Sequence, residues 1–223
     1  MDVLYLLLVV TVIFSLVVQF KVSSTFNKYS HVSAGGGRAA WEVARRILDA
    51  HGLFDVRIER VHGNLTDHYD PRARVLRLSD SVYANSSAAA VGVAAHEVGH
   101  AIQHAENYAP IVWRSKLVPA VNFASKFSWI AILLGLLFSN YMLSLGIILF
   151  AVTTLFHLVT LPCELNASDR ALTELELCGW YNGGELVASK KVLRAAAMTY
   201  VAALAMSVIQ LLRLIAIFGR RDD

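Results

Sequence analysis

The sequence predicts a mainly α-helical, polytopic membrane protein with about four transmembrane helices and a small polar α+β part. Hydrophobic residues make up 56% of the 223 residues and charged residues only 17%, which is too apolar for an ordinary soluble domain. The apolar residues gather in runs near the ~20 residues that a bilayer-spanning helix needs. The formal net charge is +3, and no basic stripe alternates with aromatic residues, so nucleic acid is not expected as a partner.

The first apolar run, residues 3–20, carries no charge and is expected to be a retained membrane anchor. A cleaved signal peptide is the alternative. It calls for a basic N-terminal region, whereas Asp2 is the only early charge, and only a weak small-residue site follows.

The second apolar stretch is too long for one span, and Ser139-Asn140-Tyr141 is its natural turn. We therefore expect a hairpin with arms 117–138 and 142–161, the second arm ending at Pro162. The expected parts, in order, are an anchor (1–20), a polar part (21–116), the transmembrane hairpin (117–161), a polar segment (162–194), a last span (195–212) and a tail (213–223).

The polar part is predicted to contain both helices and strands. Ser33 is expected to cap a helix that runs to about Ala50. Residues 54–61 and 73–79 alternate like strands, and the turn formers between them predict a β-hairpin. Ser86 or Ser87 then caps an Ala-rich helix over 88–105.

That last helix contains His96-Glu97-Val98-Gly99-His100, which matches H-E-x-x-H. Residues four apart lie on one face of a helix, so His96 and His100 can reach one metal ion. Glu97 is then close enough to take a proton from a water on that ion, which predicts a zinc peptidase. The competing interpretation is a pair of core histidines on an Ala-rich helix, because so short a motif also occurs by chance.

The third metal ligand has to come from elsewhere in the chain. The Cα of His104 lies ~12 Å along the helix from that of His96, beyond the reach of the same ion. The extended pattern H-E-x-x-H-x-x-G-x-x-H also fails, since Gln103 and Glu106 stand at its Gly and last His.

A distant carboxylate is therefore expected, and Glu164 is the best candidate. It follows the transmembrane hairpin, which would fold it back toward the H-E-x-x-H helix. Asp169, Cys163 and Glu174 remain alternatives. Glu164 itself has the simpler interpretation of a carboxylate at a helix N-terminus.

Three segments together resemble the YugP-type neutral zinc metallopeptidases of bacterial membranes: AAHEVGHAIQHAENYAP, GNLTDHYDP with LRLSD, and LPCELNASDRA. The resemblance covers nearly the whole chain. It implies a zincin-like catalytic part holding one Zn²⁺ through His96, His100 and Glu164, with Glu97 as general base. It also implies a multi-pass protein of the bacterial cytoplasmic membrane.

The chain is also similar to the HtpX and CAAX-prenyl membrane proteases, which combine H-E-x-x-H with E-x-x-A-D. Here Ser168 stands at the position of that last Asp, and Asp169 follows one residue later. A 100° helical step puts Asp169 on another face, so its role as an outer carboxylate that orients a ligand histidine stays open.

Further site residues are weaker candidates. Residues 73–79 are expected to be an edge strand that pairs with substrate. Tyr69 or His68 could donate to the oxyanion, although the same segment could simply build a turn. His157 is an ionisable residue within a predicted span and is a functional candidate for that reason.

The sequence thus predicts a zinc-dependent endopeptidase that acts on peptides or membrane proteins at the bilayer surface. Twelve Lys and Arg in 21–116 and four in 163–194, against none in the 139–141 turn, predict that both polar segments are cytoplasmic. The alternative function is a non-catalytic membrane protein with a structural or sensory zinc site, closed by a fourth ligand such as Cys163. No oligomeric state is predicted.

Overall fold

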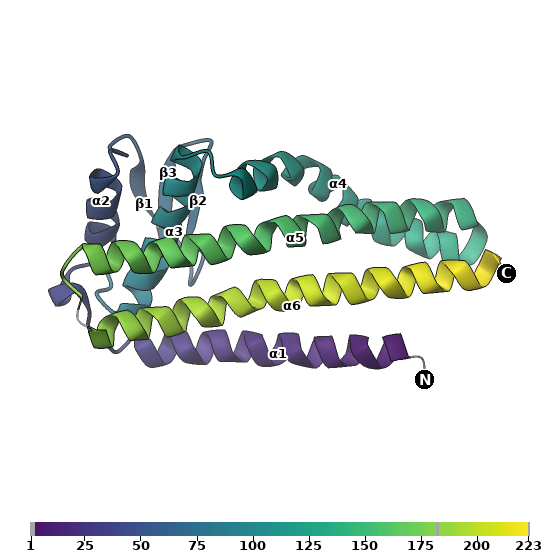
Figure 1. The fold of residues 1–223 in the computed structure, drawn as a ribbon, viewed down its shortest axis with the longest axis horizontal. Helices are drawn as coiled ribbons and strands as arrows, with labels where there is room; N and C mark the ends of the chain where they lie inside the picture. Colours follow the sequence, from purple (N-terminus) through teal and green to yellow (C-terminus); the bar gives the residue numbers. More distant parts are fainter. Residues whose placement is uncertain (1–2, 182, 223) are drawn as a thin grey trace. The chain divides into compact units, whose positions relative to one another are not determined.

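The computed structural model describes residues 3–181 and 183–222. The elements are α1 (Val3–Tyr29), a 3₁₀ turn (Gly35–Gly37), α2 (Ala40–Ala50), β1 (Arg57–Val61), β2 (His68–Asp70), β3 (Val75–Ser79), α3 (Ala88–Ala105), α4 (Ala109–Phe138), α5 (Asn140–Leu177) and α6 (Gly183–Asp222) (Figure 1). They form two compact units. The apolar-helix unit comprises 1–18, 112–162 and 199–223, and the polar unit comprises 19–111 and 163–198.

Among the described residues, four helices are long and apolar enough to cross a membrane, namely Val3–Tyr29, Ala109–Phe138, Asn140–Leu177 and Gly183–Gly219. Each contains one of the four predicted spans, which confirms the polytopic prediction. The turn between α4 and α5 falls at Ser139, where the sequence predicted it. The two helices approach closely there, because a Cβ on Gly135 would lie 2.3 Å from the backbone nitrogen of Leu143.

The helices run on beyond the predicted spans. Pro162 lies inside α5, so the prediction that it ends this helix is wrong. Proline lacks an N–H and removes one bond of the helical ladder, which bends a helix without always stopping it. The continuation to Leu177 carries Glu164 and its neighbours into the polar unit.

The polar unit contains a three-stranded sheet in the order β1-β3-β2. β1 pairs with β3 in parallel, with Arg57 opposite Val75, and β2 pairs with β3 antiparallel, with Tyr69 opposite Leu76. A β-hairpin is therefore present, but β2 and β3 form it. The expected antiparallel pairing of 54–61 with 73–79 is wrong, because the intervening segment supplies a strand of its own.

A side-chain carboxylate stabilises the turn of the β2–β3 hairpin. Asp70 Oδ1 accepts hydrogen bonds from the backbone N–H groups of Arg72 (3.0 Å) and Ala73 (3.2 Å). Arg74 then takes a positive φ of 51°, which reverses the chain into β3. Asp side chains commonly stabilise turns by bonding the backbone two residues on.

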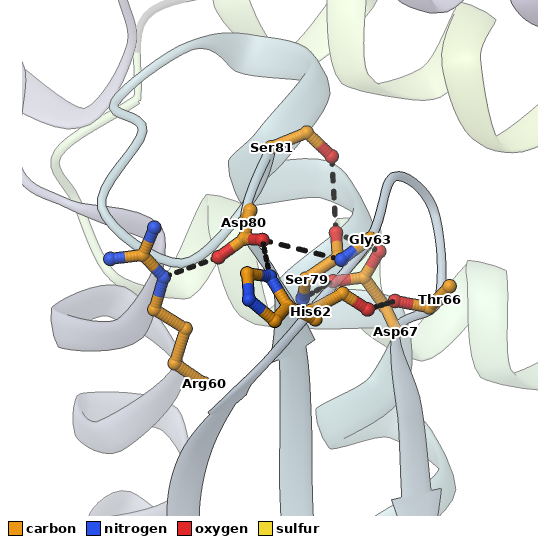
Figure 2. A network of polar contacts seen from close by, with 8 residues as sticks. All are labelled: Arg60, His62, Gly63, Thr66, Asp67, Ser79, Asp80 and Ser81. Carbon is orange, nitrogen blue, oxygen red and sulfur yellow. Dashed lines mark hydrogen bonds and ion pairs between the residues drawn. The ribbon is translucent and has the colours of Figure 1, made fainter.

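A second polar network fixes the loop that enters β2 (Figure 2). Asp67 accepts hydrogen bonds from the N–H (2.7 Å) and hydroxyl (2.9 Å) of Ser79, which ties the start of β2 to the end of β3. Asp80 accepts from Arg60 (2.6 Å) and the backbone of Gly63 (3.3 Å) and pairs with His62 (2.7 Å). The three-residue strand β2 is thus held at both ends by side-chain contacts.

Helix α3 lies against β2 and β3, and α2 packs on α3 (Figure 1). Ser87 caps α3, since its Oγ accepts from the backbone N–H of Ala90 at 3.2 Å. Ser33 does not cap α2; it forms an isolated bridge with Ser87, and the N–H of Ala39 bonds Glu42 at the start of that helix. The shared apolar core includes Val43, Ile47, Leu48, Leu76, Leu78, Val98, Ile102 and Leu175.

Candidate metal centre

His96 and His100 project from the same face of α3, as their spacing requires. Their ring centroids are 4.8 Å apart and the rings are nearly perpendicular, at 82°. His100 is buried and His96 is half-buried. One side of the pair therefore faces the protein core, and the other is closer to solvent.

Glu164 completes the cluster from α5. Its Oε2 lies 3.2 Å from Nε2 of His96 and 3.4 Å from Nε2 of His100, although it is 68 residues from His96 in the chain. The ligand atoms of the three residues all lie within 4.8 Å of one another. Within the described residues this is the only such group of three or more.

The chemistry of the cluster fits a zinc ion. Two imidazoles and one carboxylate are the protein ligands of a well-known type of catalytic zinc site. Burial alone would lower the pKa of His100, but hydrogen bonds with Cys163 and Glu164 raise it. The site thus favours positive charge between these side chains, and a divalent cation supplies that charge.

Gly99, inside the H-E-x-x-H motif, allows Glu164 to come this close. A Cβ at Gly99 would lie 2.6 Å from the carbonyl oxygen of Ala167 on α5. Since no real Cβ sits so near a backbone oxygen, a side chain at this position would push the two helices apart.

Glu97 lies beside the edge of the sheet. Its Oε2 accepts a hydrogen bond of 3.0 Å from the backbone N–H of Tyr69 in β2. The phenol oxygen of Tyr69 lies 3.0 Å from Nδ1 of His104, on the last turn of α3. Backbone and side chain of Tyr69 therefore both connect β2 to the motif helix.

This arrangement corrects the predicted substrate strand. β3, which contains most of residues 73–79, is the central strand with neighbours on both sides, so its backbone cannot take another strand. β2 is the edge strand next to α3. His68, on the same strand, is exposed and bonds the carbonyl of Thr66 at 2.9 Å.

The histidine ligand candidates each have a partner at their second ring nitrogen. Ser168 Oγ lies 3.1 Å from Nδ1 of His96, and Gln103 Oε1 lies 3.0 Å from Nδ1 of His100. Asp169 is exposed and, with Ser168 and Lys190, lines a cavity of about 390 Å³. Ser168 thus takes the place beside His96 that was considered for Asp169.

Gln103 and Ser168 were not predicted from the sequence as site residues. The available signal was a polar residue one helical turn from a ligand candidate, in otherwise small or apolar surroundings. Gln103 follows His100 by three residues, and Ser168 follows Glu164 by four.

The rival ligands have other partners. The Cys163 thiol donates to Gln103 Oε1 at 3.3 Å, and Glu174 pairs with His51 at 2.9 Å. His157 belongs to the apolar-helix unit, where its ring lies against that of Phe156. Its functional role, like those of His68 and Tyr69, stays a prediction.

Comparison with known proteins shows the family of the chain. Residues 4–219 match the family described as "Putative neutral zinc metallopeptidase". The chain is 51% identical over 207 residues to the "Putative membrane protease YugP" of Bacillus subtilis (strain 168), covering 92% of each protein. No match was found among solved structures. The chain therefore belongs to the family of putative neutral zinc metallopeptidases.

Proposed function

We propose that this protein is a membrane-bound, zinc-dependent endopeptidase whose zinc is held by His96, His100 and Glu164. One observation carries the proposal. Three ligand atoms from α3 and α5 lie within 4.8 Å of one another, and Glu97 lies beside them with its carboxylate toward an edge strand. A bound zinc ion would supply Lewis acidity, which lowers the pKa of water and polarises a carbonyl.

Glu97 is the proposed general base. Its carboxylate takes a proton from the attacking water and then gives that proton to the leaving amine. The backbone N–H of Tyr69 holds one carboxylate oxygen at 3.0 Å, which orients the group. The other oxygen then remains for the water.

The edge strand suggests how a peptide is presented. An extended substrate can pair with the outer edge of β2, the side away from β3, as peptides do when they add a strand to a sheet edge. The N–H of Tyr69 faces away from β3 on that side, where it bonds Glu97. Backbone pairing of this kind favours unfolded or extended peptide segments, including those of membrane proteins, as substrates.

We place the polar unit on the cytoplasmic side of the bacterial membrane. Support comes from the twelve Lys and Arg of 21–116 and the four of 163–194, since basic residues gather on cytoplasmic loops. The lipid bilayer is then a permanent partner of the four apolar helices.

The test compares full-length protein purified in detergent as wild type, Glu97→Gln and Glu164→Ala, with zinc content and casein cleavage measured for each. We expect one zinc per chain in wild type and Glu97→Gln, and at least a 100-fold lower cleavage rate in Glu97→Gln, the scale typical of a lost general base. Glu164→Ala should lose zinc.

Glu174→Gln is the matched control, because it alters another carboxylate of α5 that pairs with His51 instead. It should keep both zinc and activity. Zinc in every variant without cleavage in any would favour a structural or sensory site. Absence of zinc from folded wild type would contradict the proposal.

A further inference from the structure

Gln103 is the most deeply buried polar side chain near the metal centre. It has 0% exposure and sits on α3, one turn after His100. A buried amide without partners is costly, so a glutamine in this position needs a full set of hydrogen bonds.

The structure provides that set. Gln103 Nε2 donates to the carbonyl oxygen of Cys163 (2.8 Å) and to Asn166 Oδ1 (2.9 Å). Its Oε1 faces His100 Nδ1 (3.0 Å) and accepts from the Cys163 thiol (3.3 Å). An amide has two donor hydrogens and two acceptor lone pairs, and all four are used.

Only one assignment of donors and acceptors is consistent with these contacts. A backbone carbonyl can only accept, so the group facing the Cys163 oxygen must be the NH₂ of Gln103. The amide oxygen therefore faces His100, whose Nδ1 must carry a hydrogen and donate it. That leaves Nε2 of His100, the nitrogen nearest Glu164, as the atom able to bind a metal.

The same side chain joins the two helices that supply ligands. Cys163, whose carbonyl it binds, directly precedes Glu164 in α5. Asn166 also accepts from Arg170 Nε (2.8 Å), and Arg170 pairs with Glu106 (2.7 Å) at the end of α3. Gln103 thus begins a chain of contacts that joins α3 to the residues on both sides of Glu164 in α5.

We propose that Gln103 is a positioning residue for the metal centre: it fixes the tautomer of His100 and holds Glu164 against it. The inference rests on the proposed zinc site. His96 is held differently, because the hydroxyl of Ser168 both donates and accepts and cannot impose a direction. Loss of the hydrogen-bond partner should therefore lower zinc affinity more at His100 than at His96.

The experiment measures zinc affinity by competition with a chromophoric chelator, together with the visible absorption spectrum of the cobalt-loaded protein. Both use the purified full chain. The main variant is Gln103→Met, which keeps the length of the side chain and removes its hydrogen bonds. We expect a 10- to 100-fold loss of zinc affinity, the usual effect of losing an outer partner of a ligand histidine, and an altered cobalt spectrum.

Ser189→Ala is the matched control. Ser189 is also fully buried, and its hydroxyl donates to the carbonyl of Ala88 at the far end of α3 (2.8 Å). It removes a hydrogen bond that ties α3 to another helix without touching the cluster. It should lower the melting temperature while leaving zinc affinity and the cobalt spectrum unchanged. Ser168→Ala should fall between the two in affinity.

Equal zinc affinity in Gln103→Met and Ser189→Ala would overturn the inference. If Gln103→Met does not fold, Gln103→Asn provides the same test, because its shorter amide cannot span from His100 to Cys163. Both readouts are independent of proteolysis, so a wild type that binds zinc but cleaves nothing still tests Gln103. A folded wild type that binds no zinc would reject the site and this role together.

Discussion

The residues of the candidate metal centre differ in how far their side chains are buried. The side chain of Glu164 is 2% exposed and that of His100 9%, whereas that of His96 is 15% exposed. Glu97, next to His96, is half-buried and faces β2. The less enclosed side of the cluster is therefore the side with the proposed base and the edge strand, where a substrate has to approach.

At the residue scale, Asp80 makes stability depend on pH. Hydrogen bonds from His62, Arg60 and Gly63 lower its pKa from 3.8 to about 2. Because the folded pKa is below the unfolded one, the stabilisation is present above about pH 4 and is lost as the pH falls toward 2. Asp80→Asn should therefore melt below wild type at pH 6, with the difference disappearing near pH 2.

The measurement is a series of melting temperatures for both proteins between pH 2 and pH 6. A constant difference over that range would contradict the expectation. Asp80 holds the loop before β2 (Figure 2), so the same variant reports on how firmly the edge strand is fixed.

At the scale of elements, the close approach of α3 and α5 sets the geometry of the site. Gly99→Ala should separate them, because the new Cβ would lie 2.6 Å from the carbonyl of Ala167. Overpacking of this kind costs about 1–3 kcal/mol, and zinc affinity should fall with it. Melting temperature and zinc binding of the purified protein are the measurements.

Gly92→Ala is the control on the same helix. Its Cβ would meet Ser189, with the side chain at 3.2 Å and the backbone Cα at 3.5 Å. The gain of about 1 kcal/mol in helix propensity from Gly to Ala should offset that mild contact. If both variants keep wild-type zinc affinity, the close contact at Gly99 does not control the site.

At the scale of the whole molecule, the orientation in the membrane is testable by cysteine labelling. Tyr141, in the first turn of α5, is 89% exposed, and Phe54 in the polar unit is 74% exposed. With Cys178 changed to Ser and Cys163 buried, single cysteines at these positions should be the reactive ones. An impermeant maleimide added to intact cells should label Tyr141→Cys, and label Phe54→Cys only after permeabilisation.

The opposite labelling pattern would place the polar unit outside the cell. The expectation follows from the concentration of Lys and Arg in 21–116 and 163–194. Labelling of both positions after permeabilisation serves as the internal control for reactivity.

Much of the fold and of the candidate site could be predicted from the sequence alone, because the patterns that predict them lie within short segments of the chain. Apolar runs of sufficient length predict the spans, and the Ser139 turn between two of them lies where expected. Ser87 followed by an Ala-rich stretch predicts α3, and spacing within that helix puts His96 and His100 on one face. Glu164 was also predicted, since a transmembrane hairpin returns the chain to its starting side.

Only the tertiary structure determined the rest. The parallel pairing of β1 with β3, the edge position of β2 and the partners of Gln103 join residues far apart in the chain, the last across 60 residues. Three-residue β2 is too short for alternation to reveal, and a buried glutamine looks like any polar residue until its partners are known. Periodicity reports which face of an element is buried, whereas the choice of neighbour depends on how distant segments pack together.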